Sequence, residues 1–215
     1  MRIDAPRLVS PSLDDLVVAG PELAFDPNGT DGVQIEGAEW QDRRLSGVTF
    51  RETHFDRAHA AGVRLPDCRF LDVRFTALDG HDVTAPGSTW RDSEIVESRL
   101  GSAVLSESQI SSLRIERCKI GYLGFAAAEV LDLLIDGCTL DELDLSDSQC
   151  TRVAIRDTRL GLLRVAGARL RHVDLREARL GSVTPVSGLR GAALTVAQVL
   201  DLAGELAAEA GILVD

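Results

Sequence analysis

Large apolar residues recur at every fifth position from Ile35 to Leu180. Of the 30 positions on this lattice, 26 carry a large apolar side chain, and the four exceptions are Ala60, Gly80, Ala85 and Cys150. An α-helix repeats every 3.6 residues and a flat strand every 2.0, so neither produces a strict period of five. A short period held without interruption over so long a stretch is typical of a solenoid.

The position two residues before each central residue is also restricted to small or aliphatic side chains, and we expect it to point inward. Larger residues in this row, such as Leu113 and Leu123, alternate with smaller ones, such as Ser108 and Cys118. The alternation predicts faces of two kinds, and a tube with four faces and 20 residues per coil satisfies it. Charged residues, small polar residues and glycine dominate the other three positions, which we expect to face solvent.

This repeat resembles that of the pentapeptide-repeat family, whose consensus is Ala-(Asp/Asn)-Leu-X-X. Matching units include residues 167–171 (Gly-Ala-Arg-Leu-Arg), 178–180 and 143–147, and the resemblance covers residues 31–184. It implies an all-β solenoid, a right-handed quadrilateral β-helix. Thirty units at four per coil predict about seven and a half coils and, at roughly 4.8 Å per coil, a tube on the order of 36 Å long. Arginine often replaces the consensus Asp or Asn, which changes the surface and not the core.

The two ends lack the repeat. Residues 1–30 contain four prolines, and we expect an N-terminal cap of extended segments and turns over the first coil. In residues 185–215, Thr195 is a candidate N-cap and Gly211 a candidate C-cap for one helix over 196–210. This helix is expected to close the last coil. In pentapeptide-repeat proteins that inhibit topoisomerases, a C-terminal helical region mediates homodimerisation, so the resemblance also implies a dimer contact, with the candidate residues Val199, Leu202, Leu206, Ile212 and Leu213.

The repeat weakens between residues 76 and 89. Gly80 and Ala85 occupy central positions there, beside Pro86 and Gly87. Two missing side chains would leave a void unless the wall moves inward, so a distorted coil is expected.

Candidate catalytic chemistry is sparse. Cys68, Cys118, Cys138 and Cys150 all occupy inward positions. Cys118 and Cys138 are predicted to stack one coil apart, but in-register parallel neighbours suit a disulfide poorly and no Cys-x-x-Cys spacing indicates zinc. Buried free thiols are therefore expected. The four histidines do not converge with other reactive residues, so we predict a protein that is not an enzyme and has no metal or cofactor.

The formal net charge is −11, which argues against direct binding to nucleic acid because phosphate neutralisation needs a basic surface. No apolar run approaches the length of a membrane span, and the first residues lack the apolar core of a signal peptide. A soluble cytoplasmic protein is expected.

One segment is strongly acidic. Between Ile120 and Thr151 there is no Lys or Arg, and the acidic belt there comprises Glu129, Asp132, Asp136, Asp141, Glu142, Asp144 and Asp147. Arginines follow it from Arg152 to Arg179 and form a basic collar. The belt is either a solvated surface paired with neighbouring coils or a site offered to a basic groove. Leu131, Leu134 and Tyr122 are candidates for an apolar anchor beside it.

Two functions are open. Some pentapeptide-repeat proteins bind DNA gyrase or topoisomerase IV in place of the DNA duplex and lower quinolone sensitivity, and the uninterrupted lattice resembles the loopless mycobacterial type. Residues 1–30 and 185–215 carry −3 each, however, which leaves only −5 on the tube. The alternative is an interaction scaffold with an unknown protein partner. A continuous acidic stripe would favour duplex mimicry, and alternating bands would favour the scaffold.

Overall fold

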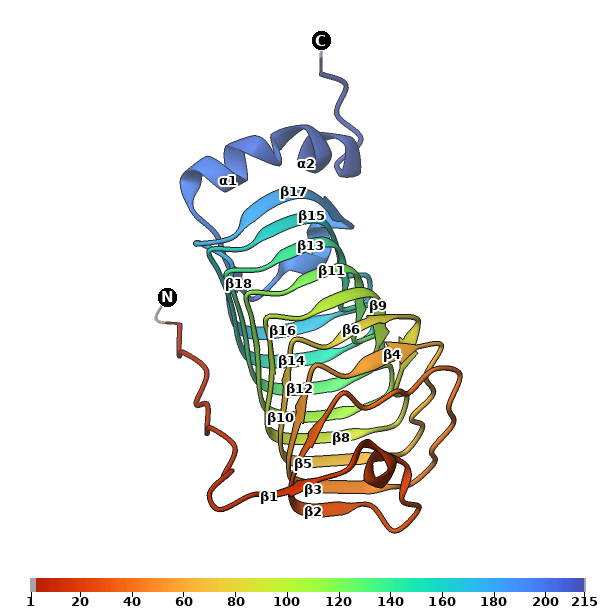
Figure 1. Cartoon of the computed structure of the whole chain (residues 1–215). Helices are drawn as coiled ribbons and strands as arrows, with labels where there is room; N and C mark the ends of the chain where they lie inside the picture. Colours follow the sequence, from red (N-terminus) through yellow and green to blue (C-terminus); the bar gives the residue numbers. More distant parts are fainter. Residues whose placement is uncertain (1–2, 215) are drawn as a thin grey trace.

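The computed structural model describes residues 3–214 and shows an all-β solenoid of about nine turns with short helices at its C-terminal end (Figure 1). The expected fold class is confirmed. Each coil takes 20 residues, as the parallel register Ile110, Val130, Cys150 demonstrates. The turn count exceeds that of the lattice because strands outside the repeat extend one sheet at both ends.

The strands form two parallel sheets that run the length of the tube. The ten-stranded sheet contains, in spatial order, β1 (Val17–Ala19), β2 (Thr30–Glu36), β3 (Thr49–Asp56), β5 (Arg69–Thr76), β8 (Thr89–Val96), β10 (Gln109–Glu116), β12 (Glu129–Asp136), β14 (Gln149–Arg156), β16 (Arg169–Asp174) and β18 (Ala192–Ala193). The eight-stranded sheet contains β4 (His59–Ala61), β6 (Asp79–His81), β9 (Arg99–Val104), β11 (Lys119–Gly124), β13 (Thr139–Asp144), β15 (Arg159–Arg164) and β17 (Arg179–Thr184), with β7 (Val83–Thr84) paired to β9.

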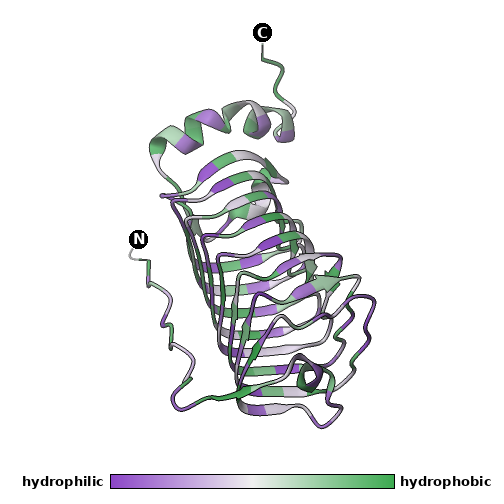
Figure 2. Ribbon diagram, viewed as in Figure 1, coloured by the Kyte–Doolittle hydropathy of each residue, from purple (hydrophilic) through white to green (hydrophobic). Residues whose placement is uncertain are grey.

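The core is the period-five lattice itself. Central residues such as Ile115, Phe125 and Ile135 are fully buried, and so are residues of the second inward row such as Leu113 and Leu133. Hydrophobic and hydrophilic residues accordingly alternate along the strands in Figure 2. Full burial of one such side chain contributes about 1.5–3 kcal/mol, so stacked rows stabilise every coil against its neighbours.

Corners of the tube depend on residues in the left-handed region. In the middle of the longer strands of the ten-stranded sheet, a residue such as Asp72, Ser112 or Asp132 has φ between 57° and 62°. The strand register omits these residues, so the chain turns there and each strand covers two faces. The corner residues lie 20 residues apart and form a column along the tube.

Aromatic residues fill the weak coil. Gly80 and Ala85 lie among rings from the adjacent coils, including Phe70 and Trp90, whose ring centroids are 4.0 Å apart. A small apolar cavity of about 30 Å³ remains. The distortion expected from the sequence takes the form of two short strands, β6 and β7, in place of one longer strand.

The C-terminal segment closes the last coil with two helices, α1 (Val196–Asp201) and α2 (Ala203–Glu209), where the sequence predicts one. The helix is interrupted at Leu202, which has ψ near 6° and is buried against the core. Thr195 and Gln198 form a capping box, and Gly211, with φ of 73°, ends α2. The Gln198 side chain donates to the carbonyls of Leu175 and Ala178 at 2.7 and 2.8 Å, which satisfies acceptors that the last coil would otherwise expose. Within residues 3–214, no helix is long and apolar enough to cross a membrane.

At the other end, β1 and the 3₁₀ helix η1 (Pro21–Phe25) pack on the first coil. Residues 4–12, which we call the N-terminal arm, lie elsewhere than the expected position over that coil: they extend along the side of the tube (Figure 1). The arm has no strand partner, and its backbone is held by side chains of the corner column.

Candidate interaction surfaces

The acidic belt encircles one coil. Glu129, Asp132 and Asp136 lie on β12; Asp141, Glu142 and Asp144 lie on β13; and Asp147 lies in the turn that follows. The side chains therefore point to several sides of the tube, and the structure does not bring all seven together on one face.

Two belt carboxylates are neutralised by the basic collar. Asp132 is only 6% exposed and accepts two hydrogen bonds from Arg152, both at 2.6 Å, and a third from the backbone N–H of Arg7 at 2.7 Å. Burial alone would raise the pKa of Asp132, but the Arg152 guanidinium and the Arg7 amide outweigh it and lower the pKa. Glu142 pairs with Arg164 in the same way.

Asp144 is occupied by a hydroxyl. Tyr122 donates to it at 3.0 Å, and burial together with this hydrogen bond raises the pKa of Tyr122 to about 12. The exposed members of the belt are Glu129, Asp141 and Asp147. Of the expected apolar anchors, Leu131 is 39% exposed, whereas Leu134 is buried between Arg114 and Ala154 in the strand register.

The ten-stranded sheet carries a ladder of ion pairs. Its members include Arg74 with Glu94 at 2.8 Å and Arg117 with Glu97 at 3.1 Å, each joining successive coils. Such exposed pairs stabilise the fold by about 0–1 kcal/mol each. Their main consequence is electrostatic, because opposite charges alternate along this surface where a duplex mimic would need one sign.

The N-terminal arm binds the corner column at regular intervals. Its backbone N–H groups donate to polar side chains in the pairs Asp4 to His172 (3.2 Å), Arg7 to Asp132 (2.7 Å), Val9 to Ser112 (2.8 Å) and Ser12 to Asp72 (3.2 Å). Eight residues thus span five coils. At about 4.8 Å per coil this is about 3 Å per residue, the rise of an extended chain. The sequence analysis missed this contact, although polar residues at multiples of 20 along the corner were visible in it.

Apolar side chains gather at the C-terminal end. Among the candidate dimer residues, Leu206 is 42% exposed, and Val199, Ile212 and Leu213 are also exposed. Leu202 is only 3% exposed because it closes the core. Val196, Leu200 and Val214 add further exposed apolar surface that the sequence analysis did not single out.

The four cysteines are buried free thiols, and burial raises the pKa of Cys150 to about 11. The Cys118 backbone N–H donates to the sulfur of Cys138 at 3.3 Å, so these residues do stack one coil apart. Within the described part of the chain, no group of three or more His, Cys, Asp or Glu side chains is placed to hold a metal ion.

Comparison with known proteins yields matches to solved structures only: no family model and no curated protein sequence matches the chain. A trypsin-treated variant of QnrB1, described as a plasmid-mediated fluoroquinolone resistance protein, is 16% identical with a TM-score of 0.43, over 93% of this chain and 99% of that one. Full-length QnrB1 is 12% identical with a TM-score of 0.35, over 83% and 99%. HetL, a pentapeptide repeat protein involved in heterocyst differentiation regulation from the cyanobacterium Nostoc sp. strain PCC 7120, is 14% identical with a TM-score of 0.25, over 73% and 78%.

These distant likenesses carry no argument about function. The period-five lattice and the 20-residue coils that it builds are properties of this chain itself. On that ground the chain belongs to the pentapeptide-repeat β-solenoid proteins.

Proposed function

We propose that this chain is a non-catalytic protein that binds other proteins through the outer surface of its solenoid. The observation that carries the proposal is the presentation of charged side chains in 20-residue register on a rigid apolar core. Each row fixes its charges about 4.8 Å apart along the axis, an arrangement suited to a partner with regularly spaced charges.

The chain also has an exposed apolar surface at its C-terminal end, formed by Val199, Leu206, Ile212 and Leu213 on and after the closing helices. Contiguous exposed apolar surface of this kind is typical of a protein contact. We propose that it joins two copies end to end, with Leu202 excluded from the contact because it packs on the core. A dimer would double the length of the tube available to a partner.

A more specific form of the function is duplex mimicry, in which the tube occupies the DNA-binding groove of DNA gyrase or topoisomerase IV. The net charge of −11 and the elongated shape support it. The ion-pair ladder and the neutralised carboxylates Asp132 and Glu142 restrict it, so the acidic contact would rest on Glu129, Asp141 and Asp147.

A supercoiling assay with purified gyrase, with and without a fluoroquinolone, tests the specific form. Mimicry predicts inhibition or drug protection by the wild type, and its loss in the triple variant Glu129→Lys, Asp141→Lys, Asp147→Lys. The matched control reverses three exposed acids on other coils, Asp67, Asp82 and Glu177. An inactive wild type, or equal loss in both triple variants, would reject duplex mimicry and leave the general binding role with another protein partner.

A further inference from the structure

A row of four exposed cations follows the eight-stranded sheet. Arg99, Lys119, Arg159 and Arg179 occupy the first position of four strands, with Thr139 between the second and the third. In contrast to the arginines of the ion-pair ladder, none of these four side chains has a carboxylate within 4.0 Å or a hydrogen bond from its charged group, among residues 3–214. We call this set the cation row.

Stacked like charges on neighbouring strands are unfavourable. Arg99 and Lys119 are direct register partners on β9 and β11, as are Arg159 and Arg179 on β15 and β17. The solenoid has the means to relieve such repulsion, because Arg117 and Glu97, two residues away from this row, pair across coils at 3.1 Å. The cation row therefore carries uncompensated charge in a fold that compensates charge elsewhere.

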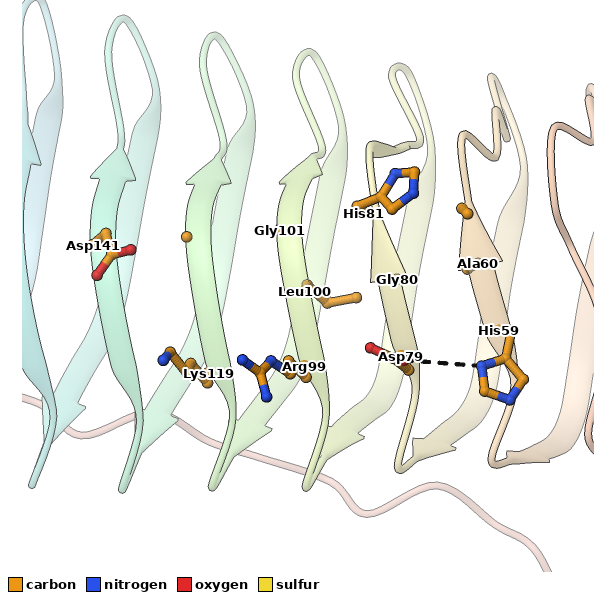
Figure 3. A pocket seen from close by; sticks show the side chains of 12 residues that line it. His59, Ala60, Asp79, Gly80, His81, Arg99, Leu100, Gly101, Lys119 and Asp141 are labelled. Atoms are coloured by element: carbon orange, nitrogen blue, oxygen red, sulfur yellow. Dashed lines mark ion pairs between the residues drawn. The ribbon is translucent and has the colours of Figure 1, made fainter.

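The surface beside the cation row is held free of side chains by glycine. Gly101, Gly121, Gly161 and Gly181 lie two positions further along the same strands, and a Cβ on Gly121, Gly161 or Gly181 would come within 2.3–2.6 Å of a carbonyl oxygen of the coil below. The result is a shallow groove of about 410 Å³ in the region of β4 to β13. Figure 3 shows Arg99 and Lys119 side by side at its edge, with Asp79 directed to His59.

The acids around the groove leave the cation row open. Asp79 begins the row and interacts with His59 at 4.0 Å, and Asp141 extends toward Gly121. Asp157 and Glu177 precede Arg159 and Arg179 by two residues, at the corner of the coil, and lie beyond ion-pair distance. The four cations and the glycine floor thus define a linear surface that an anionic chain can approach.

We infer that the cation row binds an extended acidic peptide of a partner protein, lying along the solenoid axis. The cations lie at about 0, 5, 14 and 19 Å along the axis, given roughly 4.8 Å per coil. Alternate residues of an extended peptide lie about 6.6 Å apart on one side, at about 0, 7, 13 and 20 Å. Flexible Arg and Lys side chains absorb differences of this size.

The molecule already binds one extended segment in this direction. The N-terminal arm crosses five coils over the corner column, and its backbone is held at four points from Asp4 to Ser12. The net charge of −11 favours a peptide over nucleic acid, because a long polyanion would be repelled by the rest of the surface. This inference rests on the proposed role of the outer surface in protein binding and is independent of gyrase.

The test measures fluorescence anisotropy of a labelled heptapeptide, Glu-Thr-Glu-Thr-Glu-Thr-Glu, titrated with the full chain at low salt. We expect saturable binding that weakens with salt and is stronger than binding of an isomer with four contiguous glutamates. Replacing Arg99, Lys119, Arg159 and Arg179 by Gln should weaken it about tenfold or more. The control replaces by Gln four exposed arginines of the ten-stranded sheet, namely Arg51, Arg69, Arg169 and Arg171, and should leave affinity within about twofold.

Circular dichroism of both quadruple variants verifies that the fold is intact. Equal loss of affinity in the two variants, equal affinity for the two peptides, or no binding by the wild type would overturn the inference. Tighter, row-dependent binding of an oligothymidylate would also overturn it and assign the cation row to nucleic acid. A wild type that inhibits gyrase but ignores the peptide would refute this inference alone.

Discussion

Replacing Leu123 by Ala tests the inward stacking on which the fold depends. Leu123 is 1% exposed and lies in register between Ala103 on β9 and Leu143 on β13. The substitution removes three carbon atoms, and at about 0.8 kcal/mol per buried methylene the lost transfer energy is about 2.4 kcal/mol. A cavity term adds to it where the surroundings cannot collapse.

Collapse is restricted here because backbone hydrogen bonds fix the spacing of the coils. The Leu105 N–H donates to Gly124 at 2.7 Å, and the Phe125 N–H donates to Asp144 at 2.8 Å. We therefore expect a total loss of about 3–4 kcal/mol in the free energy of unfolding. The matched control is Leu131→Ala on the neighbouring strand β12, which is 39% exposed and should lose less than about 1 kcal/mol.

Guanidinium unfolding followed by circular dichroism measures both variants. Tryptophan fluorescence gives a second, local signal, because Trp40 and Trp90 both lie in the N-terminal coils, away from Leu123. In a solenoid each coil contacts only its neighbours, so the circular dichroism transition can shift while the tryptophan transition stays in place. If Leu123→Ala costs no more than Leu131→Ala by either signal, the inward assignment of this row is wrong.

Three further outcomes follow from the same structure. Asp132→Asn should release the N-terminal arm and speed its proteolysis while the solenoid stays folded; acid should do the same, because a carboxyl with a lowered pKa contributes fully above its unfolded value of about 3.8 and loses its contribution as pH falls below it. Leu206→Glu should weaken the proposed end-to-end dimer in sedimentation, whereas Ala208→Glu on the same helix should have a smaller effect; an unchanged dimer would show that α2 only closes the coil. Cys150, with its pKa raised to about 11, should resist a thiol reagent at pH 8 until denaturant is added, and rapid labelling of the folded chain would contradict its burial.

The core and the C-terminal caps could be predicted from sequence because each is a local pattern. Every inward residue repeats at the same spacing, so the burial of Ile115 or Leu133 follows from the lattice. Thr195, Gln198 and Gly211 define the helix ends through contacts within a few residues of themselves. The break at Leu202 was not predictable from periodicity, because this residue fits the helical pattern and is displaced by its contact with the core.

The fate of the acidic belt could have been predicted with one further step. A residue and its partner 20 positions later are about 4.8 Å apart in a parallel solenoid, within reach of an ion pair. Asp132 is therefore placed beside Arg152, and Glu142 lies close to Arg164. Belt and collar look like separate bands along the chain, but neighbouring coils join them and neutralise part of both.

The path of the N-terminal arm could not be predicted in this way. Its residues follow no period, and Pro6 and Pro11 indicate only an extended chain. Its position is decided by acceptors on residues that are up to 168 positions away, such as His172 for Asp4. Sequence reasoning identifies those acceptors only after the coil length is known.

The surface of the tube is thus used in two ways. Along the ten-stranded sheet, charges are paired across coils and the corner column already holds the N-terminal arm, so that side is largely satisfied by the chain itself. Along the cation row of the eight-stranded sheet, like charges remain stacked without partners above a glycine floor. Because unpaired stacked charge costs stability and paired charge does not, the cation row is the part of the solenoid whose composition is better explained by a partner than by the fold.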